Sequence, residues 1–580
     1  MSHLFNDQGI WLSGAFLARP FANSALIGAL AIFTILVVDY LNNQQKRRRL
    51  GGCPIVGDAP HLWRRLRTKP INYQALFQSG YDTVCKYSRL KRTRIEKEQF
   101  SKRSKPFAVW QQNDDFVIVV PPGTEEEIKN VGPDKLSFLH AVNDSYHFWL
   151  HTKILGRSHI DAVQLLVNKN MSLSRDPGWL LDLLTISEEL HQAVVKQSDE
   201  TIPDYFDPLA RVGEPFSAFL AIWHLTHVAA ASFLVGPEFA KNKKYTDAIE
   251  YYCLQTPSFA HMYFWLPAPI RKIYWFLSPE GAKIRASLKT MKQEVGPAIR
   301  EMVAAWRRGD KARNEATLLR AMLEVKTESG QIKKEAVSSG DRREEEQQVD
   351  IFEDELIFTG FDSAGPVVCL VVQLLFETIR HQDIVEPLRR ELAAALKASG
   401  GEWTDQAMRS LPRMDSFTRE VLRVDGPTLF SMTRSVRQAM QLKTAGDLHV
   451  RPGSIITSPA WMMHNDAEYY DNPSEFNPWR FYSEETKTVT ARSTTTSNKF
   501  LVYGYGVGTC PGRHIGIRWS QIMFGKLLMR YDAAFEDVAK GKPDNIVMPG
   551  QLLPPYMAKI VLRRREDCDA GDFPETLRGD

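Results

Sequence analysis

One ten-residue stretch near the carboxyl end constrains this chain more than any other: Tyr503 to Gly512, with the sequence YGYGVGTCPG. It places four glycines and a proline around a single cysteine, Cys510. Glycine keeps the backbone free of side chains and tolerates left-handed conformations. Such a loop can cradle a phosphate, hold a reactive or disulfide-bonded thiol, or let a large flat group approach a metal-bound thiolate.

The residues around the cysteine separate these three uses. A P-loop needs Gly-Lys-Ser/Thr and a dinucleotide fold needs GxGxxG, and the stretch contains neither pattern. A catalytic cysteine needs a histidine base brought to it by folding, which the sequence leaves open; His514 is close but lies where a helix is expected to begin. A thiolate on haem iron needs bare backbone against the porphyrin and N–H groups aimed at sulfur, which glycines supply. Pro511 suits the first turn of the following helix, whose N-terminus favours an anion.

Composition excludes several other classes of protein. Lys plus Arg total 73 and Asp plus Glu total 69, so the net charge of +4 gives no sign of a nucleic-acid partner. The six cysteines lie far apart without a CxxC pair, which argues against a zinc module, an iron–sulfur cluster and a disulfide scaffold. We therefore expect the catalytic part to face a reducing compartment.

The amino end differs from the rest of the chain. Residues 22–38 carry no charge, which is close to the roughly 20 apolar residues needed to cross a bilayer core about 30 Å thick. The basic run Lys46 to Arg49 follows directly, and the positive-inside rule places it in the cytoplasm. A cleaved signal peptide would show the opposite order. The sequence predicts a retained single span over about residues 22–41.

Apolar residues recur at helical spacing over most of residues 145–425, so the chain is predicted to be mainly α-helical. Phe107 to Gly123 contains two β-rich runs that predict a hairpin, followed by a helix from Thr124. Few strands are expected elsewhere. The polar stretch Gly330 to Asp350 is interpreted as an exposed loop, and the tail after Arg563 as disordered.

The cysteine loop resembles that of the cytochrome P-450 superfamily, Phe-x-x-Gly-x-Arg-x-Cys-x-Gly. Tyr503, Gly506, Cys510 and Gly512 fall in register with it. Two positions depart: Tyr503 replaces the phenylalanine, and Gly508 replaces the basic residue that would bind a haem propionate. The resemblance implies that these four residues surround the haem and that Cys510 binds its iron.

Two further segments extend the resemblance to a set of charged residues. Glu420-x-x-Arg423 is a common helical pair and weak by itself. Together with Arg480, in a segment rich in proline and aromatic residues, it is similar to the family's buried Glu-Arg-Arg triad, whose role is structural. Arg434 stands where the family often places a propionate donor and is expected to compensate for Gly508; its alternative reading is an ordinary surface arginine.

The segment Thr359 to Pro366, TGFDSAGP, is similar to the family's distal oxygen-binding segment. Asp362 and Ser363 take the positions of the acid and the alcohol that deliver protons, with serine in place of the usual threonine. Pro366 removes the helical hydrogen bond to the Asp362 carbonyl, so we expect the helix to open there. The alternative is a kinked core helix with a capped aspartate.

The resemblance implies a mainly α fold with a small β lobe, the cytochrome P-450 fold, behind one transmembrane helix. We expect an anchor over residues 1–45, a basic and Pro/Gly-rich hinge over 46–60, the haem domain over 61–563 and a disordered tail over 564–580. The implied cofactor is heme b with iron on the Cys510 thiolate. The implied partners are NADPH-cytochrome P-450 reductase, membrane lipid and a hydrophobic substrate, at the endoplasmic reticulum membrane with the catalytic domain in the cytoplasm.

The implied reaction is O2- and NADPH-dependent oxidation of a lipophilic small molecule. Segments such as LSFLHA, MDSFTREVLR and CPGRHIG resemble the fungal branch that oxidises terpenoids and related secondary metabolites, including the ent-kaurene oxidase type. Two alternatives remain open. One is a haem-thiolate isomerase or dehydratase that needs no reductase, and the other is a non-catalytic membrane protein that binds haem or sterol.

Overall fold

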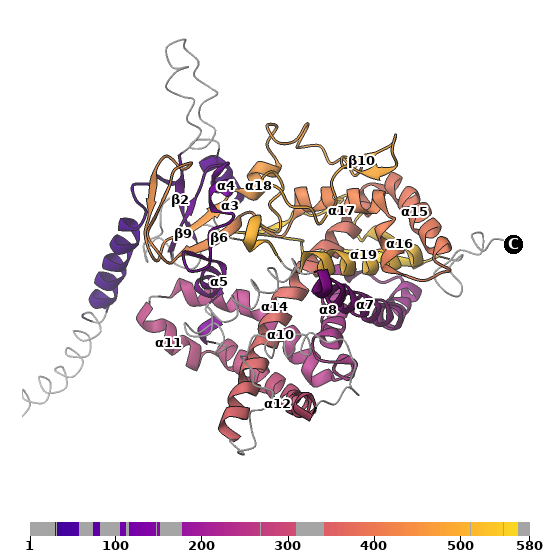
Figure 1. Ribbon diagram of the computed structural model, residues 1–580, viewed down its shortest axis with the longest axis horizontal. Coiled ribbons are helices and arrows are strands. Elements are labelled where there is room, and N and C mark those ends of the chain that lie inside the picture. Colours follow the sequence, from indigo (N-terminus) through magenta and orange to yellow (C-terminus); the bar gives the residue numbers. More distant parts are fainter. Residues whose placement is uncertain are drawn as a thin grey trace, which may run out of the picture.

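A computed structural model of the chain describes residues 30, 32–56, 73–81, 105–111, 115–146, 148–150, 177–266, 268–308, 342–510, 512–548 and 550–565. A long helix, α14 (Arg342–Arg380), runs through the middle of the molecule (Figure 1). It packs against α8 (Ala218–Leu234), α10 (Lys243–Trp265), α12 (Pro279–Arg308) and α19 (Arg513–Arg530).

Within the described ranges, Val349–Arg380 of α14 is the one helix long and apolar enough to cross a membrane. However, 61% of its most apolar window is buried inside the protein. A helix that is surrounded by other helices needs apolar side chains on most of its faces. We therefore interpret α14 as the central core helix.

Other helices complete the α-helical part and its connections. They are α3 (Tyr73–Gly80), α4 (Thr124–Ile128), α5 (Phe138–Tyr146), α7 (Pro177–Val212), α9 (Pro237–Ala240), α11 (Ala268–Leu277), α15 (Val385–Ala398), α16 (Asp405–Arg409), α17 (Pro412–Asp425) and α18 (Ala460–His464), with 3-10 turns η2 (Phe148–Leu150), η4 (Gln382–Ile384) and η5 (Gly506–Gly508). Side chains often fix where they begin: the Ser217 hydroxyl accepts the Leu220 N–H at the start of α8, and Asn242 accepts the Tyr245 N–H at the start of α10.

A six-stranded sheet forms the β-rich end of the molecule, in the strand order β1-β2-β3-β9-β6-β4 (Figure 1). Its strands are β1 (Ile55–Val56), β2 (Phe107–Gln111), β3 (Asp115–Val119), β4 (Leu136–Ser137), β6 (Ser431–Val436) and β9 (Ile455–Ser458). The smaller sheets are built from β5 (Phe216–Ser217), β7 (Met440–Leu442), β8 (Leu448–Val450), β10 (Tyr482–Ser483), β11 (Thr488–Val489), β12 (Tyr531–Phe535), β13 (Ile546–Met548), β14 (Gln551–Leu553) and β15 (Lys559–Arg564). One apolar core lies among the helices and a second lies at the six-stranded sheet.

This architecture confirms the predicted class, mainly helical with a small β lobe, and the hairpin of β2 and β3 followed by α4 at Thr124. Two expectations were wrong in detail. Short strands are numerous after residue 430, because pairs such as β7 with β8 are too short to give a periodic signal. The stretch Gly330 to Asp350 was expected to be a loop, but its last part is helical from Arg342. The helix α14 includes Pro366, which has no N–H to donate to the Asp362 oxygen.

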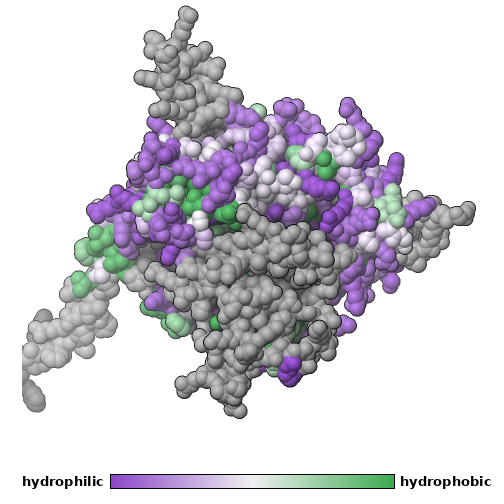
Figure 2. Space-filling model, viewed as in Figure 1, coloured by the Kyte–Doolittle hydropathy of each residue, from purple (hydrophilic) through white to green (hydrophobic). Residues whose placement is uncertain are grey.

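The predicted anchor lies mostly outside the described residues, but its carboxyl half is helical over residues 32–48. Leu30, Phe33 and Leu41 are 65%, 64% and 59% exposed, and Figure 2 shows apolar side chains along this helix where it leaves the β-rich end. The predicted hinge is partly built into the domain, since β1 pairs with β2 and Leu50 is buried. Of the predicted tail, residues 564–580, only 564 and 565 are among the described residues.

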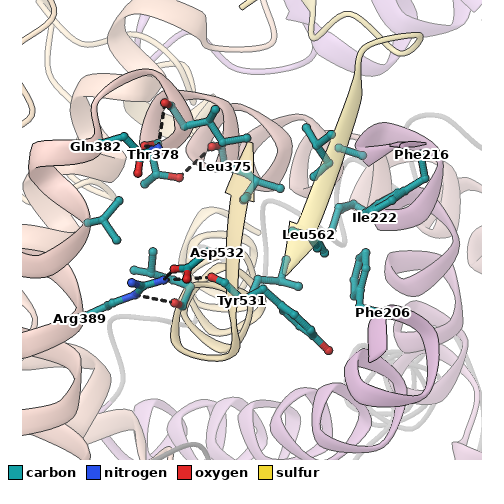
Figure 3. Close-up of a pocket in the computed structure, with 17 residues that line it drawn as sticks. Phe206, Phe216, Ile222, Leu375, Thr378, Gln382, Arg389, Tyr531, Asp532 and Leu562 are labelled. Carbon is teal, nitrogen blue, oxygen red and sulfur yellow. Dashed lines mark hydrogen bonds and ion pairs between the residues drawn. The ribbon is translucent and has the colours of Figure 1, made fainter. Parts of the chain in front are cut away.

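A cavity of about 90 Å³ lies between the carboxyl ends of α14 and α19, lined mainly by apolar side chains such as Phe206, Leu375 and Leu562 (Figure 3). Arg389 also lines the cavity, and its guanidinium group donates to the backbone oxygens of Leu528 and Tyr531 and to the Asp532 carboxylate. Leu528 lies fifteen residues along α19 from its first residue, about 20 Å at 1.5 Å per residue. This cavity is therefore separate from the cysteine loop, which precedes α19.

Candidate active site

The cysteine loop is held in a tight conformation by its own backbone. The Cys510 N–H donates to the Tyr503 oxygen at 2.8 Å, and the Val507 N–H donates to the Lys129 oxygen at 2.9 Å. Gly506 has a φ of 78°, and a Cβ placed on it would come within 2.2 Å of the Lys129 oxygen. Glycine is therefore required at position 506 by both conformation and space.

The Cys510 thiol lies just before the N-terminus of α19. Cys510 keeps accessible surface, but the surrounding protein desolvates its thiol, and this effect, followed by the charge of Asp362, raises its pKa to about 11 against the opposing effect of the Gly512 and Arg513 backbone N–H groups. A Cβ on Gly512 would lie 4.0 Å from the sulfur, so this glycine keeps the space beside the thiol open. A thiolate at this position needs a further positive charge, and a bound metal ion supplies one because a coordinating thiol loses its proton.

Asp362 and Ser363 lie on α14, across from the cysteine. Asp362 keeps accessible surface although protein surrounds it. Burial raises the pKa of its carboxyl group. The Ser363 hydroxyl is buried and has no hydrogen-bond partner in the described part of the chain. Gly360 has a packing function, since a Cβ there would come within 2.5 Å of Ile249 on α10.

Arg434, on β6, occupies the space that a side chain at position 508 would need. Its Nη2 donates to the Gly508 oxygen at 3.2 Å, and a Cβ on Gly508 would lie 2.0 Å from that nitrogen. Burial lowers the pKa of Arg434 to about 10, and among the described residues no carboxylate forms an ion pair with it. The ring of Phe138 lies 5.5 Å from its guanidinium carbon. A buried guanidinium in this state calls for an anionic partner.

These groups fit an iron porphyrin. The sulfur of Cys510 offers a metal ligand, and Arg434 offers a donor for a carboxylate. Gly506, Gly508 and Gly512 keep backbone free of side chains around them. Asp362 and Ser363 place a carboxyl and a hydroxyl group on the opposite side. Among the described residues, no group of three or more His, Cys, Asp and Glu side chains is placed to hold a metal ion.

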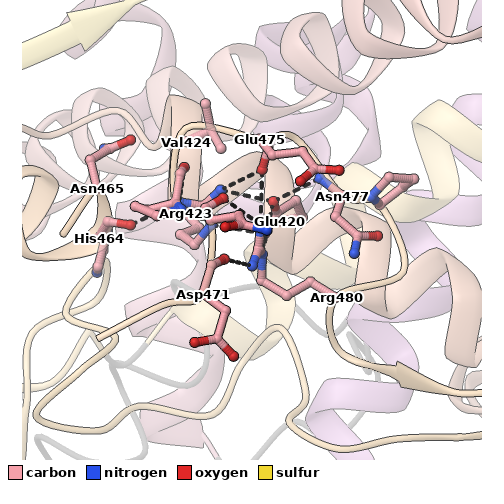
Figure 4. A network of polar contacts seen from close by, with 12 residues as sticks. Glu420, Arg423, Val424, His464, Asn465, Asp471, Glu475, Asn477 and Arg480 are labelled. Carbon is pink, nitrogen blue, oxygen red and sulfur yellow. Dashed lines mark hydrogen bonds and ion pairs between the residues drawn. The ribbon is translucent and has the colours of Figure 1, made fainter. Parts of the chain in front are cut away.

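Glu420, Arg423 and Arg480 meet in one buried network, as Figure 4 shows. The Arg423 Nε and Nη2 donate to the two Glu420 oxygens at 2.8 Å each, and Arg480 Nε lies 3.0 Å from Glu420 Oε2. The side chains of Glu420 and Arg423 are 0% exposed and that of Arg480 is 13% exposed.

Further hydrogen bonds join this network to the chain segment that leads toward the cysteine loop. Arg423 Nη1 donates to the backbone oxygens of His464 and Pro473, and Asn477 N–H donates to Glu420 Oε1. His464 itself accepts the Leu501 N–H at 3.1 Å through its Nε2. The triad thus ties α17 to the segment 464–480, and His464 in turn connects that segment to Leu501.

Two other residues considered in the sequence, His464 and Tyr503, are surrounded by protein. Burial lowers the pKa of His464 to about 3, and its ring stacks on Phe500. Tyr503 is deep in the protein beside Cys510, and its hydroxyl has no hydrogen-bond partner within the described ranges. Pro511 and His159 lie outside the described residues.

Sequence reasoning missed two residues that lie near Asp362. Tyr146, at the end of α5, receives a hydrogen bond from the Gln551 side chain on β14, and the nearby charge of Asp362 is one of the causes that raise its pKa. Neither residue belongs to a motif, and 405 positions separate them. Only the folded chain brings them together.

Comparison with known proteins identifies the architecture. A family model for cytochrome P-450 matches residues 224–562. The cytochrome P-450 monooxygenase verB of Clonostachys rogersoniana is 52% identical over 551 residues, which cover 95% of this chain and 100% of that protein. The bicoumarin synthase desC of Aspergillus desertorum is 25% identical and covers 90% of this chain and 93% of that protein. The structure of retinoic acid-bound cyanobacterial CYP120A1 shares the fold, with a TM-score of 0.55 at 14% identity, over 84% of this chain and 96% of that one.

These matches confirm the predicted fold, enzyme class and cofactor. The family binds haem with its iron on a cysteine thiolate, and the surroundings of Cys510 fit that group. The high identity to a fungal monooxygenase also confirms the resemblance to fungal enzymes of secondary metabolism. The chain belongs to the cytochrome P-450 family of haem-thiolate monooxygenases.

Proposed function

We propose that this enzyme uses electrons from NADPH-cytochrome P-450 reductase to oxidise a lipophilic secondary metabolite, a terpenoid or a related compound. The observation that carries the proposal is the pair Asp362 and Ser363 on α14, with Asp362 close enough to Cys510 for its charge to act on the thiol. Reductase-independent relatives do not need this pair, because they deliver no protons to oxygen. The acid and the alcohol therefore favour the monooxygenase over the isomerase or dehydratase.

Each residue of the site has a proposed part. Haem iron on a thiolate, when bound, supplies the activation and cleavage of O2. Cys510 is its ligand, Gly506, Gly512 and Tyr503 shape the backbone around the sulfur, and Arg434 binds a propionate. Desolvation by the surrounding protein raises the pKa of the Asp362 carboxyl group, which brings it nearer to the range in which it donates a proton. The Ser363 hydroxyl passes that proton on.

We also propose that the chain is anchored in the endoplasmic reticulum membrane with its catalytic domain in the cytoplasm. The exposed apolar helix over residues 32–48 supports this. A second apolar surface supports it too: Ile273, Phe276 and Leu277 on α11 are 56%, 64% and 78% exposed. Contiguous exposed apolar surface of this kind commonly marks a membrane or protein contact.

The reaction class is tested with the full-length protein in membranes. The dithionite-reduced protein under carbon monoxide is expected to absorb at about 450 nm, as thiolate-bound ferrous haem does. With extracts of lipophilic metabolites, oxygen from 18O2 is expected in a product only when NADPH and reductase are both present. A product formed without reductase would favour the isomerase or dehydratase, and haem binding without any product would favour the non-catalytic protein.

Moving the guanidinium group from position 434 to position 508 tests the proposed role of Arg434. The Arg434→Ala variant is expected to lose haem roughly 10- to 100-fold faster, the range for a hydrogen bond to a charged group. Adding Gly508→Arg to that variant is expected to restore slow loss, because the new arginine enters the space that Arg434 has left. Haem transfer to apomyoglobin gives the rate, and Arg437→Ala, at an exposed site, is the control. A double variant no better than Arg434→Ala alone would contradict the assignment.

Removing the distal hydroxyl tests the proton path. The Ser363→Ala variant is expected to consume NADPH while product per NADPH falls roughly tenfold or more, since a positioned proton donor contributes at least that much. Hydrogen peroxide is expected to account for the missing electrons. Ser363→Thr keeps a hydroxyl and is expected to preserve coupling. Unchanged coupling in Ser363→Ala would show that another group relays the proton.

A further inference from the structure

Beside the distal helix, two side chains from distant parts of the sequence form a hydrogen bond. The Gln551 Nε2 on β14 donates to the Tyr146 hydroxyl oxygen at the end of α5. Tyr146 keeps some accessible surface although protein surrounds it, and burial, followed by the charge of Asp362, raises its pKa to about 12. The pair thus lies near the candidate proton donor.

Neighbouring backbone and aromatic rings hold Gln551 and Tyr146 in place. The backbone of Gln551 bridges to Thr428, and the next residue, Leu552, donates its N–H to the Pro427 oxygen at 3.1 Å. The Tyr146 ring packs edge-on against Phe361, with centroids 5.6 Å apart, and lies 5.7 Å from the ring of Phe148. Neither group has to be ordered again when a ligand arrives, which lowers the cost of binding.

The hydroxyl of Tyr146 has an unused donor. A phenol oxygen accepts hydrogen bonds and its hydrogen donates one. Because the Gln551 amide donates, it uses an acceptor position on the Tyr146 oxygen and leaves the O–H hydrogen available. No hydrogen bond donated by that hydroxyl occurs within the described ranges. A donor in a protein interior is costly to leave unsatisfied, so a ligand that brings an acceptor gains affinity there.

Aromatic rings surround this donor. Phe361 lies next to Asp362 in sequence, and it packs edge-on against Phe148 at 4.9 Å and Tyr252 at 6.3 Å. Phe358, one turn earlier on α14, packs against Phe148 at 5.6 Å. Phe358, Phe361 and Tyr146 are all only partly buried. Ring faces and edges of this kind bind flat aromatic molecules in stacked or edge-on geometry.

We propose that Tyr146 determines substrate specificity by donating a hydrogen bond to a carbonyl oxygen on an aromatic substrate. Gln551 acts as a positioning residue that fixes the direction of the hydroxyl group. The aromatic body of the substrate lies against Phe361 and its neighbours, beside Asp362. This inference rests on the proposed function and, among the lipophilic secondary metabolites of that proposal, favours aromatic carbonyl compounds over terpenoids.

The test compares two probes that differ only in the carbonyl group, dihydrocoumarin and chroman. Equilibrium dialysis with the haem-loaded, full-length protein measures their dissociation constants without any turnover. The wild type is expected to bind dihydrocoumarin roughly three- to tenfold more tightly than chroman, the range for one neutral hydrogen bond. In Tyr146→Phe, which keeps the ring, this preference is expected to fall to about one while chroman affinity stays the same.

Two further variants separate specificity from general damage. Gln551→Leu leaves the hydroxyl in place without its orienting partner, so a smaller loss of preference is expected. Tyr556→Phe removes a hydroxyl from an exposed tyrosine and is expected to change nothing. A wild type that binds both probes equally, or neither, overturns the inference, and so does a preference that survives in Tyr146→Phe. The band at about 450 nm is recorded for every variant. If the band is present, equal or absent binding of the probes, or a preference that survives in Tyr146→Phe, counts against this inference alone. A wild type without the band counts against the proposed function.

Discussion

The Cys510→Ser variant is expected to lack the absorption band at about 450 nm and to lose monooxygenase activity by at least about 100-fold, because thiolate donation favours O–O cleavage. A serine hydroxyl has nearly the same size, so the loop should keep its backbone bonds, including the one from residue 510 to the Tyr503 oxygen. The carbon monoxide difference spectrum and the rate of NADPH-dependent product formation measure the two effects.

A second cysteine provides the matched control. Cys369 lies on α14, is 6% exposed, and has a pKa raised by burial to about 12, so it behaves as an apolar side chain. Cys369→Ala is expected to keep both the band and the activity. If Cys510→Ser also kept them, the sulfur of Cys510 would not be the iron ligand, and the assignment of the cysteine loop would be wrong.

The Glu420→Gln variant is expected to lower the free energy of unfolding by about 3–5 kcal/mol, the cost of breaking a buried ion pair by removing one partner. The neutral amide keeps the shape of the side chain but leaves Arg423 and Arg480 without their shared counter-charge. Because Arg423 also binds the His464 and Pro473 oxygens, the segment leading to the cysteine loop should loosen too. Urea denaturation and the yield of soluble haem protein measure the loss.

The same substitution at the surface is the control for this prediction. Glu484 pairs with Arg413 and Lys487, and its side chain is 65% exposed. Glu484→Gln is expected to leave the urea midpoint unchanged, because water screens exposed ion pairs. Equal midpoints for Glu420→Gln and Glu484→Gln would show that the buried triad contributes no more than a surface pair.

The motif residues could be predicted because each carries a local reason for its identity. Gly506 needs a left-handed backbone beside the Lys129 oxygen, and Cys510 must precede a helix. Glu420 and Arg423 are three residues apart on α17, so helical geometry alone brings them together. The expected compensation for Gly508 also agrees with the contact that Arg434 makes with it.

The predictions that went wrong depended on distant neighbours. The polar residues just before Asp350 are helical because they extend a helix whose stability comes from its buried part. Strands of two or three residues, such as β4 and β13, exist only because another strand pairs with them.

The sequence by itself determined the family, and it predicted the cysteine ligand, the acid and alcohol on the distal helix and the position of the apolar N-terminal segment, because these are local patterns of residue type and spacing. Only the tertiary structure decided that Arg434 fills the space beside Gly508 and that Gln551 orients Tyr146 beside Asp362. The physical reason is that both contacts join segments far apart in the chain, and their geometry depends on how sheet and helices pack, which spacing along the chain does not encode.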